Sequence, residues 1–233
     1  MELQDPLKIL VQRHGVNTGT IKYVVTGMKY TAVLLQNGNI GVCANLGTTV
    51  GPHLTHFKHL DLSHRAHRIL AVAYFNAHLN YAEGGTSVGD IFDVVAFEQF
   101  SSIVMVGYFA PVVERFTSSG IPLTIFDPMK EESSISPEQE KAAALAAADA
   151  VILTSTSIFN NTFADIMGAT HARAVHLLGP SSLLDPFLFE YGVTSISGTR
   201  FGTHDERVLE MIESNLGTRA FIKLGQKVTI TAP

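Results

Sequence analysis

Cysteine, tryptophan and concentrated positive charge are scarce in this sequence. The 233-residue chain holds one cysteine, Cys43, and no tryptophan. A single cysteine excludes an intrachain disulfide and any zinc or iron–sulfur site built from several cysteines. Sixteen basic residues stand against twenty-one acidic ones, which gives a formal charge of −5, and no basic tract stands out. Nucleic acid is therefore not an expected partner, because its recognition needs clustered Lys and Arg.

Long hydrophobic runs are also missing. No eighteen apolar residues follow one another, and the alanine-rich run 142–148 is ended by Asp149. The first fifteen residues, MELQDPLKILVQRHG, are charged and too polar for a secretory signal. We therefore expect no membrane partner and a cytoplasmic location. The 46% hydrophobic content suffices to bury a core in one large or two small domains, and it is compatible with a homodimer.

Residues 101–129 predict the first unit of an open α/β sheet. The apolar run 103–106 lacks polar alternation, as expected for a strand that is covered on both faces. Gly107 ends this run, and a helical pattern follows before a second apolar run that ends at Asp127. Strand, helix and strand in this order are typical of Rossmann-like folds. Only one glycine of the G-x-G-x-x-G pattern is present, so a dinucleotide is not required.

The first part of the chain predicts a small α+β domain. Asn37-Gly38 lies between two β-prone runs and favours a type I′ hairpin turn, in which both central residues have positive φ. Ser63 is a suitable N-cap for the long helix that follows. The segment 83–87 is the expected linker, which divides the chain into domains 1–86 and 87–233. The expected elements are a helix over 5–13, strands over 21–25, 30–35 and 40–43, and a helix over 63–81.

The second part predicts a mainly parallel sheet. Apolar runs alternate there with helical patterns, and such alternation places helices on both faces of a parallel sheet. The predicted fold class is therefore α/β, with a small N-terminal α+β domain followed by a Rossmann-like open sheet. Beyond the first unit we expect strands over 151–153, 174–178 and 193–196, helices over 90–100, 137–148, 162–167, 184–191 and 204–214, and an extended end over 221–230.

Small and polar residues follow the expected strands where a ligand would bind. In open parallel sheets, small molecules bind beyond the carboxyl ends of the strands. Ser, Thr, Asn and Gly are also the commonest cap and turn residues, so each position taken singly is better explained by local structure. Taken together, these positions predict a binding cleft. The candidate ligand-binding residues are Gly107, Tyr108, Thr154, Thr156, Asn160, Thr162, Gly179, Pro180 and Ser181.

Asp127 is the candidate for acid–base chemistry. It lies twenty residues beyond Gly107, about where Rossmann-like folds place a carboxylate on a ribose or a similar diol. The alternative is that its side chain caps the turn before Pro128. Loss of binding to a diol-bearing ligand in Asp127→Ala, with thermal unfolding nearly unchanged, would distinguish the ligand role from the cap.

Histidines are unusually concentrated, since six of the ten lie between residues 53 and 78. His64 and His67 are three residues apart on an expected helix and project to one side. They are therefore candidate ligands for a metal that is shared with a histidine of the preceding loop. No H-E-x-x-H pattern accompanies them. The alternative is a solvated helix face with titratable side chains.

Several segments together carry a family resemblance. The clearest are TSTSIFNNT at 154–162, LGPS at 178–181 and YGV at 191–193, and shorter ones are KYTAV at 29–33, Asn76-Ala77 and VGYF at 106–109. With these motifs the chain resembles the putative heavy-metal chelation family, a group of bacterial and archaeal proteins of unknown function. The resemblance implies a domain similar to the N-terminal part of enolase, joined to a Rossmann-like domain that is partly similar to methyltransferases.

The resemblance also implies one site lined by both domains. In such a site, Asn76 from the first domain would face Asp127, Asn160, Thr162 and Ser181 from the second. Taken alone, Asn76 on a long helix is better explained as a surface or helix-packing residue. The histidine run is not one of the family's motifs, so the resemblance does not support metal binding there.

Three candidate functions follow. The first is an enzyme that acts on a polar metabolite between the domains by condensation or hydrolysis, with Asp127 as acid/base or diol anchor. Its substrates would be metal-chelator, pterin or flavin-type compounds. The second is a non-catalytic protein that binds a transition metal or a metal chelate. The third is methyl transfer from S-adenosylmethionine, a nucleotide-like ligand that would lie near Gly107 and Asp127.

Overall fold

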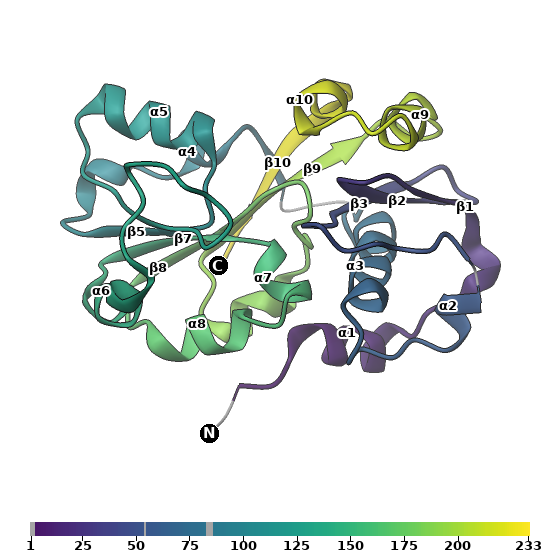
Figure 1. Ribbon diagram of the computed structural model, residues 1–233, viewed down its shortest axis with the longest axis horizontal. Coiled ribbons are helices and arrows are strands. Elements are labelled where there is room, and N and C mark those ends of the chain that lie inside the picture. The colour runs from purple at the N-terminus through teal and green to yellow at the C-terminus, as the bar shows by residue number, and fades with distance from the viewer. Residues whose placement is uncertain (1–2, 54, 83–85) are drawn as a thin grey trace.

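The computed structural model describes residues 3–53, 55–82 and 86–233. Two sheets organise this part of the chain, one of three strands and one of seven. Figure 1 shows the seven-stranded sheet and its helices on the left, and the three-stranded sheet on the right. This is the α/β fold predicted from the sequence, with a small antiparallel sheet followed by a mostly parallel one. Within the described residues, no helix is long and apolar enough to cross a membrane.

The small sheet is antiparallel and uses the strands expected from the sequence. β2 lies between β1 and β3 and pairs with both. Because neighbouring residues of a strand point to opposite faces, β2 contributes to two cores. Val33 and Leu35 join the core that contains α3, whereas Ala32 and Leu34 join a separate one. The elements are α1 (Pro6–His14), η1 (Thr18–Thr20), β1 (Ile21–Thr26), β2 (Tyr30–Leu35), β3 (Ile40–Ala44), α2 (Thr55–Lys58) and α3 (Arg65–Leu79).

The turn between β2 and β3 is not of the expected type I′. Gly38 has a φ of 91°, but Asn37 is not among the positive-φ residues of the described chain. The amide of Gly38 donates to the Leu35 carbonyl, and the amide of Leu35 donates to the Asn39 carbonyl. This pattern matches a three-residue loop, a type I turn followed by a left-handed glycine that forms a bulge. The Asn-Gly pair predicted the hairpin, and the predicted turn type was wrong.

The start of α3 also differs from the prediction. The N-cap residue is His64, and the helix begins at Arg65. The amide of Ser63 donates to Asp61 Oδ1 at 2.9 Å, within the turn that precedes the helix. The Asp61 carboxylate organises this turn, as Asp commonly does, and the helix starts one residue later than a Ser63 cap requires. The predicted N-cap was therefore wrong.

The large sheet has the strand order β4-β10-β9-β8-β7-β5-β6. The strands from β6 across to β9 are parallel to their neighbours, whereas β10 runs antiparallel to both β9 and β4. Of the extended end expected over 221–230, residues 221–224 are helical instead, and β10 joins the sheet in the opposite direction. The strand expected over 193–196 is β9, which begins and ends later. The strands are β4 (Thr86–Val88), β5 (Ile103–Val106), β6 (Thr124–Phe126), β7 (Ala150–Thr154), β8 (Ala174–Leu178), β9 (Ser195–Phe201) and β10 (Gly225–Thr231).

Both faces of the large sheet are buried, as the uniformly apolar strands predict. Ile103 and Met105 of β5 pack in one core with Val112 and Phe116, whereas Val104 and Val106 pack in the other. The helices of this part are α4 (Ile91–Val94), α5 (Ala110–Ser119), α6 (Lys141–Ala147), α7 (Thr156–Phe159), α8 (Phe163–Ala169), α9 (Arg207–Glu213) and α10 (Thr218–Phe221).

Three expected helices are partly or wholly 3₁₀ structure. Residues 90–100 divide into α4 and η2 (Phe97–Gln99), and residues 137–148 divide into η3 (Glu138–Glu140) and α6. Residues 184–191 contain only η4 (Pro186–Tyr191), and η5 (Ile222–Leu224) precedes β10. Short 3₁₀ turns are frequent as connectors and at helix ends, which the 3.6-residue periodicity used for prediction does not resolve.

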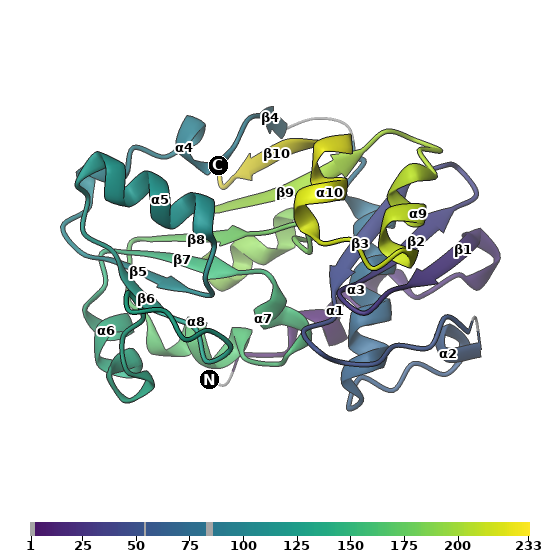
Figure 2. The same cartoon turned by 45° about the horizontal axis from the view of Figure 1, so that its top comes forward.

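The last helices return to the first sheet. α9 and α10 lie over β1–β3, on the side away from α3 (Figures 1 and 2). Val208 and Ile212 of α9 and Phe221 of α10 form one core with Ala32 and Leu34 of β2. The small sheet is therefore covered by α3 on one face and by the end of the chain on the other. The predicted domain boundary falls next to residues 83–85, which lie outside the described residues.

Candidate functional site

The sheet reverses its strand order at β5. Chain order runs from β5 to β6 on one side and then to β7 on the other side of β5. Such a reversal leaves a crevice at the carboxyl ends of the parallel strands, where open α/β sheets bind their ligands. We call the carboxyl ends of β5, β6, β7 and β8, with the residues that follow them, the carboxyl edge. The predicted residues at this edge are Gly107, Tyr108, Asp127, Thr154, Thr156, Gly179 and Pro180.

Gly107 brings the loop after β5 against the end of β7. Its φ is 97°, and a Cβ added there would lie 2.7 Å from Thr154 Cβ. The left-handed backbone and the close approach both require glycine. The Thr154 and Thr156 hydroxyls lie 3.1 Å apart and share one hydrogen bond. Because each hydroxyl is both donor and acceptor, this half-buried pair keeps bonding capacity for another molecule.

Asp127 links the ends of β6 and β5. Its Oδ2 accepts the amide proton of Tyr108 at 2.7 Å, and its Oδ1 accepts that of Met129 at 2.8 Å. The side chain therefore organises the turn after β6, as the capping alternative required. An ionised carboxylate offers about four acceptor positions, so two bonds leave capacity for hydroxyl groups of a ligand. The half-buried position of Asp127 is compatible with both roles.

Phe109 is a residue of the carboxyl edge that the sequence reasoning missed. It is the N-cap residue of α5, and a Cβ added at Gly179 would lie 3.6 Å from its Cζ. Because β7 lies between β5 and β8, the half-buried ring reaches across the end of β7 to Gly179. An aromatic side chain directly after Gly-Tyr and before a helix start was the available signal.

Asn76 and Ser181 lie elsewhere, in the contact between the two sheets. Asn76 Nδ2 donates to the Val42 carbonyl at 2.7 Å, and Ser181 Oγ accepts the amide proton of Ala44 at 3.0 Å. Both side chains are 2% exposed. Burial also raises the pKa of the nearby Cys43 thiol far above its ordinary value, so this thiol stays protonated. These two predicted site residues hold β3 in place and do not reach solvent.

Asn80 completes this contact and was not singled out from the sequence. Its Nδ2 donates to Asn76 Oδ1 and to the Ser182 carbonyl, and its Oδ1 accepts the amide proton of Leu184. The Ser182 hydroxyl continues the network to Ser155 and to the Ser197 carbonyl. We call this buried set, Asn76, Asn80, Ser181 and Ser182, the seam. Asn80 bonds to Asn76 and Ser182, and Ser181 bonds to the backbone of β3.

Asn160 and Thr162 follow the C-terminal end of α7, whereas Thr156 at its N-terminal end belongs to the carboxyl edge. Asn160 Oδ1 accepts hydrogen bonds from the amide and the hydroxyl of Thr162, at 3.2 and 2.7 Å. Asn160 also lines a surface hollow of about 390 Å³ between α1, the start of α3 and the end of α7. We call it the seam hollow; its lining residues are Asp5, Lys8, Leu62, Ser63, Arg65, Arg68, Phe159, Asn160 and Asn161. The predicted residues thus fall in three places: the carboxyl edge, the seam and the region of the seam hollow.

Comparisons with known proteins give the family. Two family models, both described as putative heavy-metal chelation, match residues 11–79 and 90–231. The chain belongs to this family. The resemblance noted from the sequence motifs is confirmed, and a search of curated proteins found no match.

Solved structures of family members share the fold. A protein of unknown function from the DUF364 family of Desulfitobacterium hafniense gives a TM-score of 0.78 at 20% identity, covering 97% of this chain and 96% of that chain. Another, from Pyrococcus horikoshii, gives a TM-score of 0.76 at 18% identity, covering 91% of this chain and 93% of that chain. At these identities the likeness shows the fold alone.

Four histidine rings of this heavy-metal chelation family member lie in succession, in the order His53, His56, His67 and His64. Asp61 donates its amide proton to His67 Nδ1 at 3.0 Å, and His67 Nε2 lies 3.1 Å from His56 Nδ1. Because Nδ1 is the acceptor, neutral His67 carries its proton on Nε2 and donates it to His56. Burial, with the neighbouring His56 and His64, lowers the pKa of His67 below its ordinary value. Both ring nitrogens of His67 are therefore in use.

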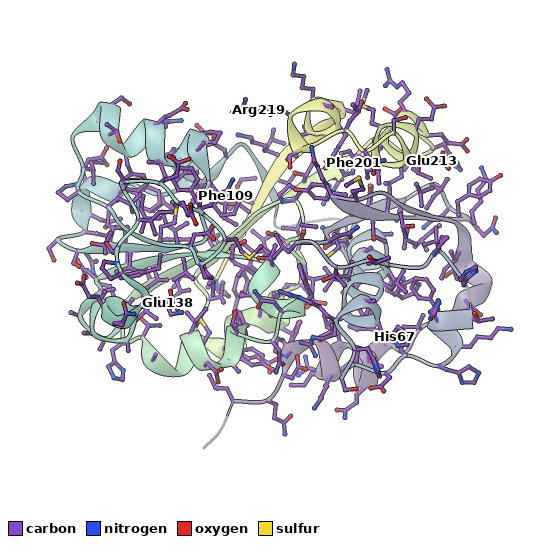
Figure 3. All side chains as sticks on the ribbon, in the orientation of Figure 1. His67, Phe109, Glu138, Phe201, Glu213 and Arg219 are labelled. Carbon is purple, nitrogen blue, oxygen red and sulfur yellow. The ribbon has the colours of Figure 1, made fainter. Side chains whose placement is uncertain are left out.

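His64 is engaged differently. Its Nδ1 lies 2.9 Å from Asp61 Oδ2, and its ring centroid is 5.6 Å from that of His67. Among the described residues, no three His, Cys, Asp or Glu side chains form a group that could hold a metal ion. Figure 3 places His67 in the small unit, far from Phe109 at the carboxyl edge.

Proposed function

We propose that this protein binds a polar, diol-bearing small molecule at the carboxyl edge, between the ends of β5, β6 and β7. The hydrogen bond from the Tyr108 amide to Asp127 Oδ2 carries this proposal. It fixes a carboxylate beside the loop that follows β5, the first of the parallel strands, where Rossmann-like folds hold a ribose. The remaining acceptor positions of Asp127 suit two hydroxyl groups.

The surrounding side chains suit a nucleoside or a pterin. The Phe109 ring offers an aromatic face on which a heterocycle stacks. The Thr154 and Thr156 hydroxyls supply donors and acceptors at the neighbouring strand, next to the close approach of Gly107. An anionic group near Asp127 would be repelled, so the bound part of the ligand is neutral or cationic.

The second part of this proposal is that the protein catalyses a reaction of the bound molecule. Asp127 is the acid–base candidate for condensation or hydrolysis of the bound metabolite. Methyl transfer from S-adenosylmethionine would use the same edge, with Asp127 on the ribose hydroxyls. In either reaction, binding of the diol precedes the chemistry, so binding is the property to test first.

The test is calorimetric titration of the purified protein with adenosine, S-adenosylmethionine and a pterin whose side chain carries a diol. We expect one of the three to bind, and we expect Asp127→Asn to weaken binding at least tenfold. Asp185→Asn is the matched control, because Asp185 is also half-buried and also accepts a backbone amide, at the start of η4. Absence of binding by all three ligands would contradict the proposal, and so would unchanged affinity in Asp127→Asn.

We propose heavy-metal binding as the second candidate, because both family models carry that description and one of them spans His53 to His78. A metal at His67 would have to replace its bond to His56 or its bond to Asp61. Metal content after purification tests this candidate. Stoichiometric metal that disappears in the double variant His64→Ala, His67→Ala would support it. Metal-free protein that binds no added Zn²⁺ would rule it out.

A further inference from the structure

The seam hollow lies where α1 and α3, which belong with the small sheet, meet α7, which belongs with the large sheet. It is separate from the carboxyl edge. α1 and the start of α3 supply one wall, and the end of α7 supplies the other. Its volume of about 390 Å³ falls in the range of small-molecule sites. The carboxyl edge and the hollow lie at opposite ends of the four-residue helix α7.

The lining of the hollow is positively charged in a chain that is acidic overall. It holds three cations, Lys8, Arg65 and Arg68, and one anion, Asp5. Asp5 pairs with Arg68 through two hydrogen bonds of 2.6 and 3.0 Å. The other donors of Arg68 bond to the carbonyls of Leu62, Ile158 and Phe159. This pair is neutral and saturated, so two positive charges remain.

The two remaining cations face the hollow from different elements. Lys8 belongs to α1 and Arg65 to the first turn of α3, and both side chains are exposed. Among the described residues, neither one forms an ion pair. The Arg65 guanidinium lies over the Phe159 ring at 5.7 Å, which directs it toward α7.

Amide groups stand opposite the cations. The carbonyl oxygen of Asn160 is occupied by Thr162, which leaves its NH₂ group as a donor. Asn161 follows with a φ of 66°, a left-handed conformation that Asn adopts more readily than most residues. A guanidinium fork, an ammonium group and amide donors around one space match an anion with several acceptor oxygens.

We propose that the seam hollow binds the phosphate group of a small phosphorylated metabolite. Lys8 and Arg65 neutralise the two negative charges, and the amide groups of Asn160 and Asn161 bond to the remaining oxygens. Because the walls belong to both units, the bound phosphate bridges α1 and α3 to α7. This site is independent of the diol proposed at the carboxyl edge.

The test is calorimetric titration with inorganic phosphate and pyrophosphate at low ionic strength. We expect saturable binding that weakens at least tenfold in the double variant Lys8→Gln, Arg65→Gln. Arg219→Gln with Lys223→Gln is the matched control, because it removes two exposed charges from the α10–η5 segment, which lies over the small sheet on the side away from α1 and α3 (Figure 1). The charge-preserving variant Lys8→Arg, Arg65→Lys should keep most of the affinity.

Three other results would contradict the proposal. No saturable binding of either anion to the wild-type protein removes the site. Unchanged affinity in the Lys8, Arg65 variant places the anion elsewhere. An equal loss in the control variant shows that net charge alone attracts the anion. Thermal unfolding of all variants checks that they fold. If the double glutamine variant does not fold, the single variants Lys8→Gln and Arg65→Gln decide the question, because each should weaken binding and unchanged affinity in both would contradict the proposal.

Discussion

The seam and the carboxyl edge both concentrate polar residues, but the two sets differ in whether hydrogen-bonding positions of their side chains remain unused. At the seam, Asn80 uses both ends of its amide on partners of the second unit and on Asn76. At the carboxyl edge, Asp127 and the threonine pair are half-buried and keep unused bonding positions. Buried polar groups that satisfy one another specify the architecture, whereas partly free ones offer binding.

The same contrast holds inside the seam hollow. Arg68 is deep in its wall, with 5% of the side chain exposed, and all its donors are used. Arg65, three residues earlier on the same helix, is exposed. Two arginines on one helix thus differ in role because only one is saturated by the protein. The following predictions test this distinction, starting with the largest expected effect.

Arg68→Ala should destabilise the protein by about 3–5 kcal/mol, the usual cost of breaking a buried ion pair. The change leaves the Asp5 carboxylate without its partner, together with the Ile158 and Phe159 carbonyls of α7. Urea denaturation measures the effect. Arg65→Ala, on the exposed side of the helix, should cost less than about 1 kcal/mol. Equal losses in the two variants would contradict the distinction.

His176 represents a third case, a buried polar group that is only half satisfied. Its Nδ1 lies 2.8 Å from Ser195 Oγ, and its Nε2 has no partner within the described residues. Burial lowers the pKa of His176 to about 4. The unfolded chain, with a pKa near 6.5, therefore binds this proton more readily than the folded protein does.

Stability should consequently fall as the pH drops from about 6.5 to about 4, by roughly 3 kcal/mol from this residue. His176→Asn keeps a partner for Ser195 and cannot titrate, so its unfolding free energy should lose this pH dependence. Denaturation at pH 7 and pH 4.5 measures the difference. If wild type and variant lose the same stability on acidification, another group is responsible.

Asn80→Ala should cost about 2 kcal/mol, because it leaves the buried Leu184 amide and the Ser182 carbonyl without their bonds. Ligand binding at the carboxyl edge should remain intact after this change. Thermal unfolding and the titrations described above measure the two properties. An Asn80→Ala variant with wild-type thermal stability but without ligand binding would show that the seam contributes to binding and not to stability.

Asp127→Ala should have the smallest effect on stability, about 1 kcal/mol, from the two backbone bonds that it removes at a half-buried position. Its effect on ligand binding should be the largest of the series. A stability loss above about 3 kcal/mol, with unchanged binding, would assign Asp127 to the turn alone.

Local patterns predicted most of the fold. β5 and β8 begin and end at the residues expected, because each is an apolar run followed by a glycine or a short polar turn. The helix after β5 was marked by Pro111 near its start and Gly120 at its end. These signals lie within a few residues of the elements they define, so one sequence suffices to read them.

Contacts between distant segments could not be predicted in this way. The side of the small sheet that α9 and α10 cover is apolar, but nothing near residues 30–35 indicates which segment covers it. Arg68 reads as an ordinary charged residue, and only the fold shows that Asp5 and the end of α7 surround it. The carboxyl-edge candidates followed from a general rule on parallel sheets, whereas Asn76 and Ser181 depended on how two units meet.

The docking of α10 on the first sheet has a consequence for synthesis. β1–β3 emerge from the ribosome before α9 and α10, and Phe221, which shares a core with Ala32 and Leu34, is made almost two hundred residues after them. Until then, one apolar face of the nascent sheet stays open to other chains or to chaperones. The small sheet therefore gains its second covering layer only after α9 and α10 have been made.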